Sequence, residues 1–330
     1  MEKLPNFLIA GAAKAGTTAI ATYLEQHPQI YLSPMKEPKF FSSQFIKFPY
    51  RGPGDDFVEN FTVKTMSSYQ RLFRWVRREK AIGEASVENL YYYQSAIPLI
   101  KSYLGDPKII IVLRNPVDRA FSAYKMMVRD GREVLSFEEA LEAEADRMMK
   151  NWEYLWYYLQ CGFYASQVQA YFQSFTNVKI VLFDDLRLNA VSCMQNIYSF
   201  LEVRESFYPK ISLKVNASGR MRSALWRLIF RASGFKGMLY KFLSLSGISD
   251  STILSVIESV REGDLEPMEM KEETRRMLQN YYREDIMKLS KIIGRDLKGW
   301  LDDKEENGTS ERTTIVKYGD ESKPLPSVAA

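Results

Sequence analysis

The stretch that most constrains the fold lies near the start of the chain, where a short apolar run leads into a glycine-bounded loop. Residues 7–10 (FLIA) are typical of a buried first strand in a parallel sheet. Gly11 and Gly16 bracket a turn of small residues, and Thr17 and Thr18 then open an amphipathic helix. Such a loop forms an anion cradle, because free backbone N–H groups and the positive end of the helix dipole face it. This stretch therefore predicts a phosphate-binding loop.

The basic residue of this loop is displaced from its usual position in nucleotide triphosphatases. The common phosphate loop reads GxxxxGK[ST], with lysine directly after the second glycine. Here the glycine spacing is kept, but Thr17 follows Gly16, and the basic residue of the loop is Lys14. The loop can still hold a phosphate, with its cation approaching from a different place. Read alone, the same stretch also fits a strand-to-helix turn that carries a solvated lysine.

The rest of the chain predicts an α/β fold, with a P-loop-type parallel β-sheet flanked by helices on both faces. We expect further strands at residues 30–32, 81–86, 108–113 and 178–183, and helices at 65–78, 94–104, 157–175 and 274–293, the third of these interrupted at Gly162. Strands that alternate with helices give a mostly parallel sheet covered on both sides. The run 108–113 (KIIIVL) is β-branched and does not alternate, so we expect it at the centre of the sheet.

Composition limits the classes of ligand. The 330 residues are 46% hydrophobic, enough to bury a full core. The net charge of +4 favours anionic ligands but makes no case for nucleic acid. Two cysteines and one histidine cannot form a usual structural zinc site, so we expect no metal. We expect buried packing for both cysteines.

The ends of the sequence carry further expectations. No stretch is long and apolar enough to span a membrane, and no signal-peptide core is present, so we predict a cytoplasmic protein. Residues 303–330 are polar and charged, which predicts a disordered tail after a domain that covers residues 1–302.

A second candidate anion site follows the predicted central strand. Arg114 comes directly after the apolar run, and arginine is seldom buried without a partner. Pro116 sits where a helix would begin, so Arg114 and Ser122 can reach one anion. Ligands of parallel sheets lie beyond the carboxyl ends of the strands, where Lys14 is also expected. The alternative is a structural ion pair between Arg114 and Asp118.

Residues 36–41 (KEPKFF) supply a candidate base. Transfer of a group to an alcohol requires a base for the hydroxyl proton, and a positioned carboxylate can take it. The single histidine, His27, sits at a helix end, where imidazole commonly caps or packs, so Glu37 is our first choice. The alternative is an exposed, solvated charge cluster. Glu84 is a second candidate acid, base or substrate ligand, unless it is a strand-end carboxylate bonded to backbone.

Together these segments resemble the sulfotransferases that use 3′-phosphoadenosine 5′-phosphosulfate, above all the branch that contains the heparan sulfate sulfotransferases and their bacterial counterparts. The resemblance rests on residues 11–18 (GAAKAGTT), on Arg114 followed by Ser122, and on residues 36–41. It extends over almost all of the chain except the tail. Residues 83–86 (GEAS) resemble the GExSPxY segment of the family, although Val87 replaces its proline.

The resemblance also implies roles for individual residues. The 5′-phosphosulfate would be held by Lys14, Ala15, Gly16, Thr17 and Thr18, the 3′-phosphate by Arg114 and Ser122, and the nucleotide covered by a basic loop that contains Arg220. Glu37 would act as the base, and Lys14 would stabilise charge on the leaving phosphate without a metal. The acceptor class stays open among saccharide, lipid and small alcohol, with amine and peptide tyrosine also available. The oligomeric state does not follow from the sequence.

Two other functional classes remain open at this point. A nucleotide kinase or NTPase would need a lysine after Gly16 and a strand-end aspartate for Mg²⁺, where this chain has Thr17 and Arg114. A non-catalytic nucleotide- or sulfate-binding protein would keep Lys14 and Arg114 but tolerate the loss of Glu37.

Overall fold

The computed structural model describes residues 3–211, 220–221 and 265–301. The strands are β1 (Phe7–Gly11), β2 (Ile30–Leu32), β3 (Ala81–Ala85), β4 (Lys108–Leu113), β5 (Val178–Leu182), β6 (Arg220–Met221) and β7 (Leu265–Glu266). The helices are α1 (Thr17–Glu25), α2 (Phe40–Ser43), α3 (Asp56–Asn60), α4 (Met66–Arg71), α5 (Glu88–Tyr91), α6 (Tyr93–Leu104), α7 (Pro116–Arg129), α8 (Phe137–Glu142), α9 (Glu144–Met149), α10 (Tyr164–Ser174), α11 (Phe183–Leu188), α12 (Ala190–Phe200) and α16 (Glu272–Ile293). Short 3-10 turns lie at Tyr154–Trp156, Gln160–Gly162 and Lys298–Trp300.

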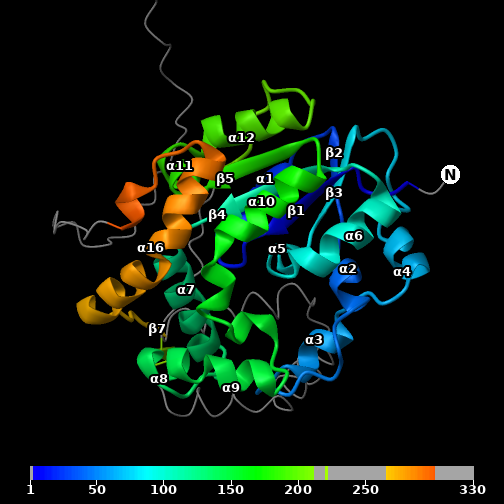
Figure 1. The fold of residues 1–330 in the computed structure, drawn as a ribbon. Helices are drawn as coiled ribbons and strands as arrows, with labels where there is room; N and C mark the ends of the chain where they lie inside the picture. The colour runs from blue at the N-terminus through cyan, green and yellow to red at the C-terminus, as the bar shows by residue number, and fades with distance from the viewer. Residues whose placement is uncertain (1–2, 212–219, 222–264, 302–330) are drawn as a thin grey trace, which may run out of the picture.

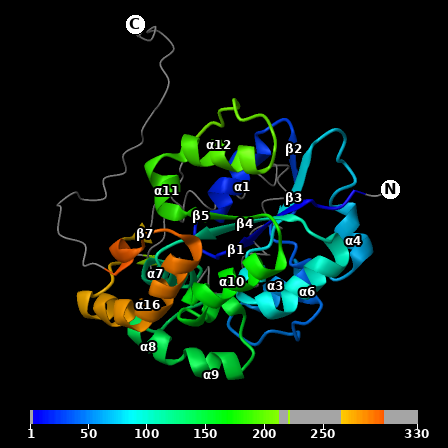
Figure 2. The ribbon, with the colours of Figure 1, turned by 45° about the horizontal axis from the view of Figure 1, so that its top comes forward.

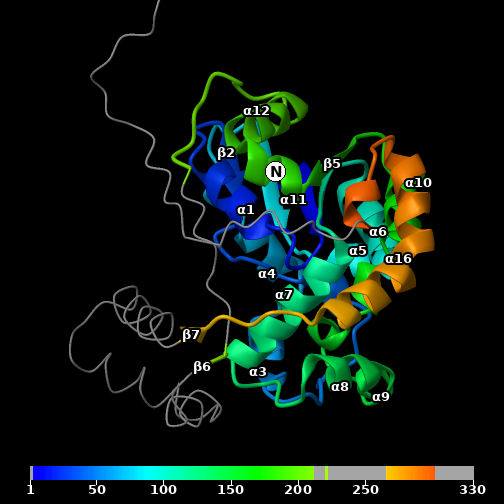
Figure 3. The same cartoon turned by 90° about the vertical axis from the view of Figure 1, so that its left-hand side faces the viewer.

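Strands β1 to β5 form one parallel sheet in the order β2-β3-β1-β4-β5. Helices α1 and α12 lie on one face, and α6 and α10 lie on the other (Figures 1 and 3). Helix α16 packs against α10 and α7 (Figure 2). The predicted α/β fold with a covered parallel sheet is therefore confirmed. The order also puts the carboxyl end of β1 between the ends of β3 and β4.

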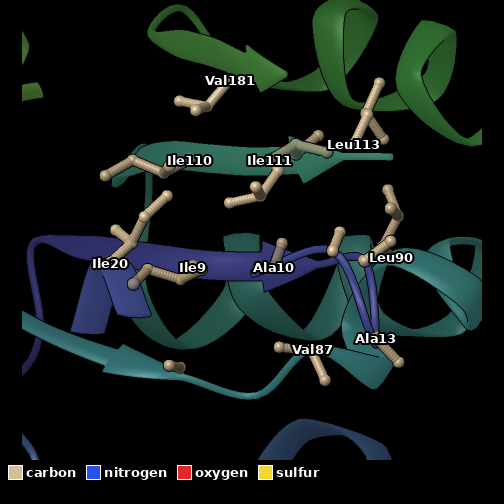
Figure 4. Close-up of a cluster of buried hydrophobic side chains, with 14 of the residues drawn as sticks. Ile9, Ala10, Ala13, Ile20, Val87, Leu90, Ile110, Ile111, Leu113 and Val181 are labelled. Carbon is tan, nitrogen blue, oxygen red and sulfur yellow. The ribbon is translucent and has the colours of Figure 1, made fainter. Parts of the chain in front are cut away.

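The core lies between the sheet and its two helical layers. Strand β1 is buried along its whole length, and β4 is buried after its first residue. Figure 4 shows Ile9 of β1 beside Ile110 of β4, with Val181 of β5 beyond them and Ile20 of α1 against the sheet. Each fully buried side chain of this size stabilises the fold by roughly 1.5–3 kcal/mol. Burial on both faces explains why these strands read as continuous apolar runs.

Helix boundaries follow local capping. The Asn115 side chain accepts a hydrogen bond from the backbone N–H of Val117 at 3.0 Å, and Pro116 takes the first position of α7, as its fixed φ favours. The predicted helix over residues 65–78 is wrong beyond Arg71, where the chain continues as turns. These turns are held at the sheet because the Tyr31 hydroxyl of β2 donates to the Leu72 carbonyl at 2.7 Å.

The predicted interruption of the helix over residues 157–175 at Gly162 is confirmed, because a short 3-10 turn ends there and α10 begins at Tyr164; residues 157–159, however, are not helical. The Asp285 carboxylate of α16 accepts from the backbone N–H groups of Tyr164 and Ala165, and so starts α10 from a distant helix. A Cβ on Gly162 would stand 2.7 Å from the Tyr282 hydroxyl, so this close approach requires glycine.

No helix within the described ranges is long and apolar enough to cross a membrane. Residues 303–330, which we expect to form a disordered tail, lie outside the described residues. The domain boundary near residue 302 and the cytoplasmic location stay predictions.

Candidate active site

The loop between β1 and α1 has the backbone conformation of an anion cradle. Lys14 has a φ of +67° and Gly16 a φ of +94°, both in the left-handed region. Gly16 is the N-cap of α1 and offers no side chain to the first N–H groups of the helix. A Cβ at this position would also meet the Phe183 ring at 2.8 Å. The positive end of α1 is therefore left without a side-chain cap, as an anion site requires.

Lys14 stands in an electropositive environment. Its Nζ contacts the Met126 sulfur at 3.3 Å. Burial lowers the pKa of Lys14 to about 8, and the positive charges of Arg129, Lys36 and Arg114 lower it further against one nearby carboxylate. Cations that repel one another in this way are stabilised by a bound anion, which would raise the pKa of Lys14 again.

Arg114 leaves the end of β4 beside this loop. Its Nη1 donates to the Lys14 carbonyl at 3.4 Å, and its guanidinium lies 4.8 Å from the Phe183 ring centroid. Burial lowers the pKa of Arg114. Asp118, the partner considered for Arg114, forms an ion pair with Arg275 Nη1 at 3.0 Å. The strand-end cations after β1 and β4 thus meet, as expected from a parallel sheet.

Ser122 lies on α7, four residues before Met126, whose sulfur touches Lys14. Arg129 follows three residues later, at the end of the same helix. Positions i, i+4 and i+7 share one helix face, so Ser122, Met126 and Arg129 line the side of α7 that faces Lys14. The sequence analysis did not place Arg129 near Lys14. Its spacing of seven residues from Ser122 could have indicated that both lie on the same face of the helix.

The loop that carries Glu37 approaches α1 from the other side. The Lys36 Nζ donates to the Thr18 Oγ1 at 2.8 Å and lies 3.8 Å from the Glu37 carboxylate. Glu37 and Lys39 have φ values of +54° and +56°. Non-glycine residues held there cost about 1–3 kcal/mol each and cluster at functional sites. The Glu37 side chain is 24% exposed, so it is enclosed but still reachable.

Lys39 differs from its neighbours in this loop. Its side chain is only 13% exposed, and its Nζ forms an ion pair at 3.1 Å with the fully buried Glu153. Burial opposes the charged ammonium, but the carboxylates of Glu153, Glu88 and Glu37 together outweigh it and raise the pKa of Lys39. The alternative of an exposed, solvated cluster is therefore wrong for Lys39, while Lys36 is 54% exposed.

Glu84 is the penultimate residue of β3 and has no exposed surface. Its Oε2 accepts from the Ser86 hydroxyl at 2.7 Å, so its partner is a side chain rather than the backbone that we considered. Burial raises the pKa of Glu84 to about 8, with the Glu88 and Glu37 carboxylates adding to the effect and Ser86 opposing it. This environment therefore favours the protonated form of Glu84.

Of the remaining predicted site residues, some lie within the described residues and one lies there only in part. Ala15 and Thr17 are buried in the loop, and Thr18 is exposed apart from its bond to Lys36. Only the backbone of Arg220 is described, in β6, which lies against α7. The side chain of Arg220 and residues 216–219 lie outside the described residues, so the predicted covering loop stays a prediction.

Histidine and cysteine have structural environments. His27 is buried, with Nε2 3.0 Å from the Arg204 carbonyl and Nδ1 accepting from the Gln29 N–H at 3.1 Å, so the expected packing role is confirmed. Cys161 and Cys193 are buried thiols, as expected. Among the residues that the structure places, no group of three or more His, Cys, Asp or Glu side chains could hold a metal ion.

Comparison with known proteins agrees with this geometry. A family model described as "Sulfotransferase family" matches residues 5–206. The human bifunctional heparan sulfate N-deacetylase/N-sulfotransferase 2 is 29% identical over 209 residues, which cover 61% of this chain and 22% of that protein. Human carbohydrate sulfotransferase 15 is 24% identical over 177 residues, 45% of this chain and 31% of that protein. The chain thus spans less than a third of the length of either curated relative.

A solved structure gives a match over almost the whole chain. The crystal structure of a sulfotransferase from Alicyclobacillus acidocaldarius is similar with a TM-score of 0.72 and 35% sequence identity, covering 91% of this chain and all of that one. The family model covers more than half of the chain, and the solved structure has the same fold. The chain belongs to the sulfotransferase family, whose enzymes use 3′-phosphoadenosine 5′-phosphosulfate as co-substrate.

Proposed function

We propose that this chain transfers the sulfuryl group of 3′-phosphoadenosine 5′-phosphosulfate to a hydroxyl or amine of a saccharide, with Glu37 as the base. One observation carries the proposal. Lys14, Lys36 and Arg114 converge near the uncapped start of α1, and the Glu37 carboxylate lies 3.8 Å from the Lys36 ammonium. Two relatives are named for heparan sulfate and for carbohydrate, which favours a saccharide among the acceptor classes.

The donor is proposed to lie across the ends of β1 and β4. The 5′-phosphosulfate would contact the loop residues Lys14, Ala15, Gly16, Thr17 and Thr18. Its anionic oxygens fit backbone N–H groups at a helix start and an unneutralised ammonium. The site is suited to a ligand with several negative charges, because its cations otherwise repel one another.

The 3′-phosphate is proposed to lie between Arg114 and Ser122. Arg114 is partly buried at the end of β4, where a guanidinium can bind two phosphate oxygens at once. Arg220 completes this side in the proposal, since its strand β6 lies against α7, the helix that bears Ser122.

The transfer itself is an in-line displacement at sulfur. The acceptor oxygen or nitrogen forms a bond to sulfur while the bond from sulfur to the 5′-phosphate oxygen breaks. The acceptor proton passes to the Glu37 carboxylate, and the leaving nucleotide keeps the electron pair of the broken bond. Lys14 stabilises the negative charge that develops on the leaving oxygen. Electrostatic stabilisation of this kind is usually the largest single contribution to lowering the barrier. Binding both substrates in this geometry lowers the barrier further, because the reacting atoms are already oriented toward each other.

Calorimetric titration with 3′-phosphoadenosine 5′-phosphate tests the donor site. Without added Mg²⁺, the wild-type chain should bind this nucleotide and bind ATP more weakly. Arg114→Ala should remove the preference for the 3′-phosphate, because the guanidinium that pairs with it is gone. A preference for Mg²⁺-ATP would contradict the proposal and favour a nucleotide kinase or NTPase.

Glu37→Gln tests catalysis and separates an enzyme from a nucleotide-binding protein. With radiolabelled donor and de-N-sulfated heparan sulfate oligosaccharides as acceptor, turnover should fall by about 10²- to 10⁴-fold, because a carboxamide cannot take the proton. Nucleotide affinity should stay nearly unchanged. Glu59→Gln, at a surface ion pair with Lys64, is the control. Equal turnover in both variants would rule out Glu37 as the base.

A further inference from the structure

The loop that carries Glu37 is tied to the end of β3 by hydrogen bonds at alternate residues. The Glu37 N–H donates to the Ala85 carbonyl at 3.1 Å, which continues the strand pairing beyond β2. The Lys39 N–H donates to the Ser86 Oγ at 3.0 Å. The Ser86 hydroxyl in turn donates to the Glu84 Oε2 at 2.7 Å. A backbone position two residues from the base is therefore bound to a buried side-chain pair.

The hydrogen bond between the Lys39 N–H and Ser86 lies where the backbone is strained. Glu37 and Lys39 both have left-handed φ values, which non-glycine residues adopt only when surrounding contacts hold them. One serine hydroxyl satisfies the Lys39 N–H and so helps to hold this conformation. If such a residue moves out of the left-handed region, its side chain points in another direction, because the Cα–Cβ bond rotates with the backbone. Ser86 thus holds the backbone two residues after Glu37, from where a change of conformation can reach the Glu37 carboxylate.

We propose, on the basis of the function proposed above, that Ser86 and Glu84 are positioning residues that orient Glu37 toward the acceptor, and that Glu84 does so in its protonated form. Glu84 takes no proton from the acceptor, because it has no exposed surface. Among the described residues its Oε1 has no hydrogen-bond partner, which disfavours a charged carboxylate at this buried position. The raised pKa of Glu84 agrees with this protonation state.

The surroundings of Glu84 also favour the neutral form. The titratable groups that interact with it are Glu37, Glu88, Tyr69 and Tyr171, none of which is a cation. The nearest lysine of the loop, Lys39, is already engaged with Glu153.

Kinetics of Ser86→Ala and Glu84→Gln test the proposal in the full chain. Ser86→Ala should lower kcat by roughly 10- to 100-fold, the effect expected from a misplaced base, while the KM for the donor changes little. Glu84→Gln should lose less than about fivefold, because a neutral amide still accepts from the Ser86 hydroxyl. Thr274→Val is the matched control, since it removes another hydroxyl–glutamate bond, to Glu138 at 2.6 Å, between α16 and α8 and outside the loop that carries Glu37.

Hydrogen exchange supplies a readout that needs no acceptor. In Ser86→Ala, the amide of Lys39 should lose protection while amides of β3 and β4 keep theirs. Unchanged kcat and unchanged protection in Ser86→Ala would overturn the inference, as would a loss in Glu84→Gln as deep as in Glu37→Gln, which would make Glu84 a proton acceptor. Absence of nucleotide binding and of transfer in the wild-type chain would instead overturn the proposed function, and this inference with it.

Discussion

Lys14→Met should make the chain more stable in the absence of nucleotide. The Lys14 ammonium is partly buried, contacts the Met126 sulfur, and is repelled by the charges of Arg129, Lys36 and Arg114. A methionine of similar length keeps the packing and removes the charge. The residue that binds the donor is therefore expected to lower the stability of the unbound protein, a trade-off that functional residues often show.

The magnitude follows from the pKa of Lys14, which folding lowers from 10.5 to about 8. At about 1.4 kcal/mol per pH unit, this displacement corresponds to a cost of up to roughly 3 kcal/mol when the lysine is charged in both states. The cost is fully present below pH 8. Between pH 8 and 10.5 the unfolded chain binds the proton more tightly, so the stability of the wild type rises with pH and the cost disappears. We expect Lys14→Met to add about 1–3 kcal/mol at pH 7 and little near pH 10.5.

Urea unfolding of both chains at pH 7 and pH 9.5 measures this difference. Lys64→Met is the control, because Lys64 forms an exposed ion pair with Glu59 at 2.6 Å and such pairs contribute only about 0–1 kcal/mol. Added 3′-phosphoadenosine 5′-phosphate should stabilise the wild type and not Lys14→Met. The reasoning is refuted if Lys14→Met is less stable than the wild type at pH 7, or if the difference does not change with pH.

Two further predictions concern the same loop. At pH 8.5, nucleotide binding should take up protons, because the bound anion returns the pKa of Lys14 toward 10.5; calorimetry in two buffers of different ionisation enthalpy should then give different apparent enthalpies, and equal enthalpies would contradict this. Gly16→Ala should lower the free energy of unfolding by about 1–3 kcal/mol, since alanine is strained at a φ of +94° and its Cβ would meet Phe183. Gly105→Ala is the control for backbone strain alone, because Gly105 has a φ of +74° and a Cβ added there would have no atom within 4 Å. If both variants lower the urea midpoint equally, the contact with the Phe183 ring is unimportant.

The meeting of Lys14 and Arg114 at one edge of the sheet was predictable because it depends on local sequence. A buried strand, two glycines and a helix start place Lys14, and a second buried strand places Arg114 at the same edge. The acceptor side was less predictable because it depends on distant contacts. Nothing in the spacing of Lys39 shows that it pairs with Glu153, 114 residues away. The loss of the helix beyond Arg71 has the same origin, since a tyrosine of β2 holds the following turn.

The order of the strands explains how one site can serve both substrates. In the proposed in-line transfer, the acceptor atom, the sulfur and the leaving oxygen lie roughly on one line, with the base beside the acceptor and the nucleotide beyond the leaving oxygen. The loop with Glu37 is bound to the end of β3, Lys14 follows β1, and Arg114 follows β4. Since the sheet runs β3-β1-β4 at its centre, these three side chains leave the sheet in the order that the reaction needs. Lys36, in contact with Thr18 and near Glu37, joins the acceptor side to the donor side. Under the proposed function, the strand order would therefore set the direction of transfer across the sheet, and the loops that follow β2 and β3 would select the acceptor.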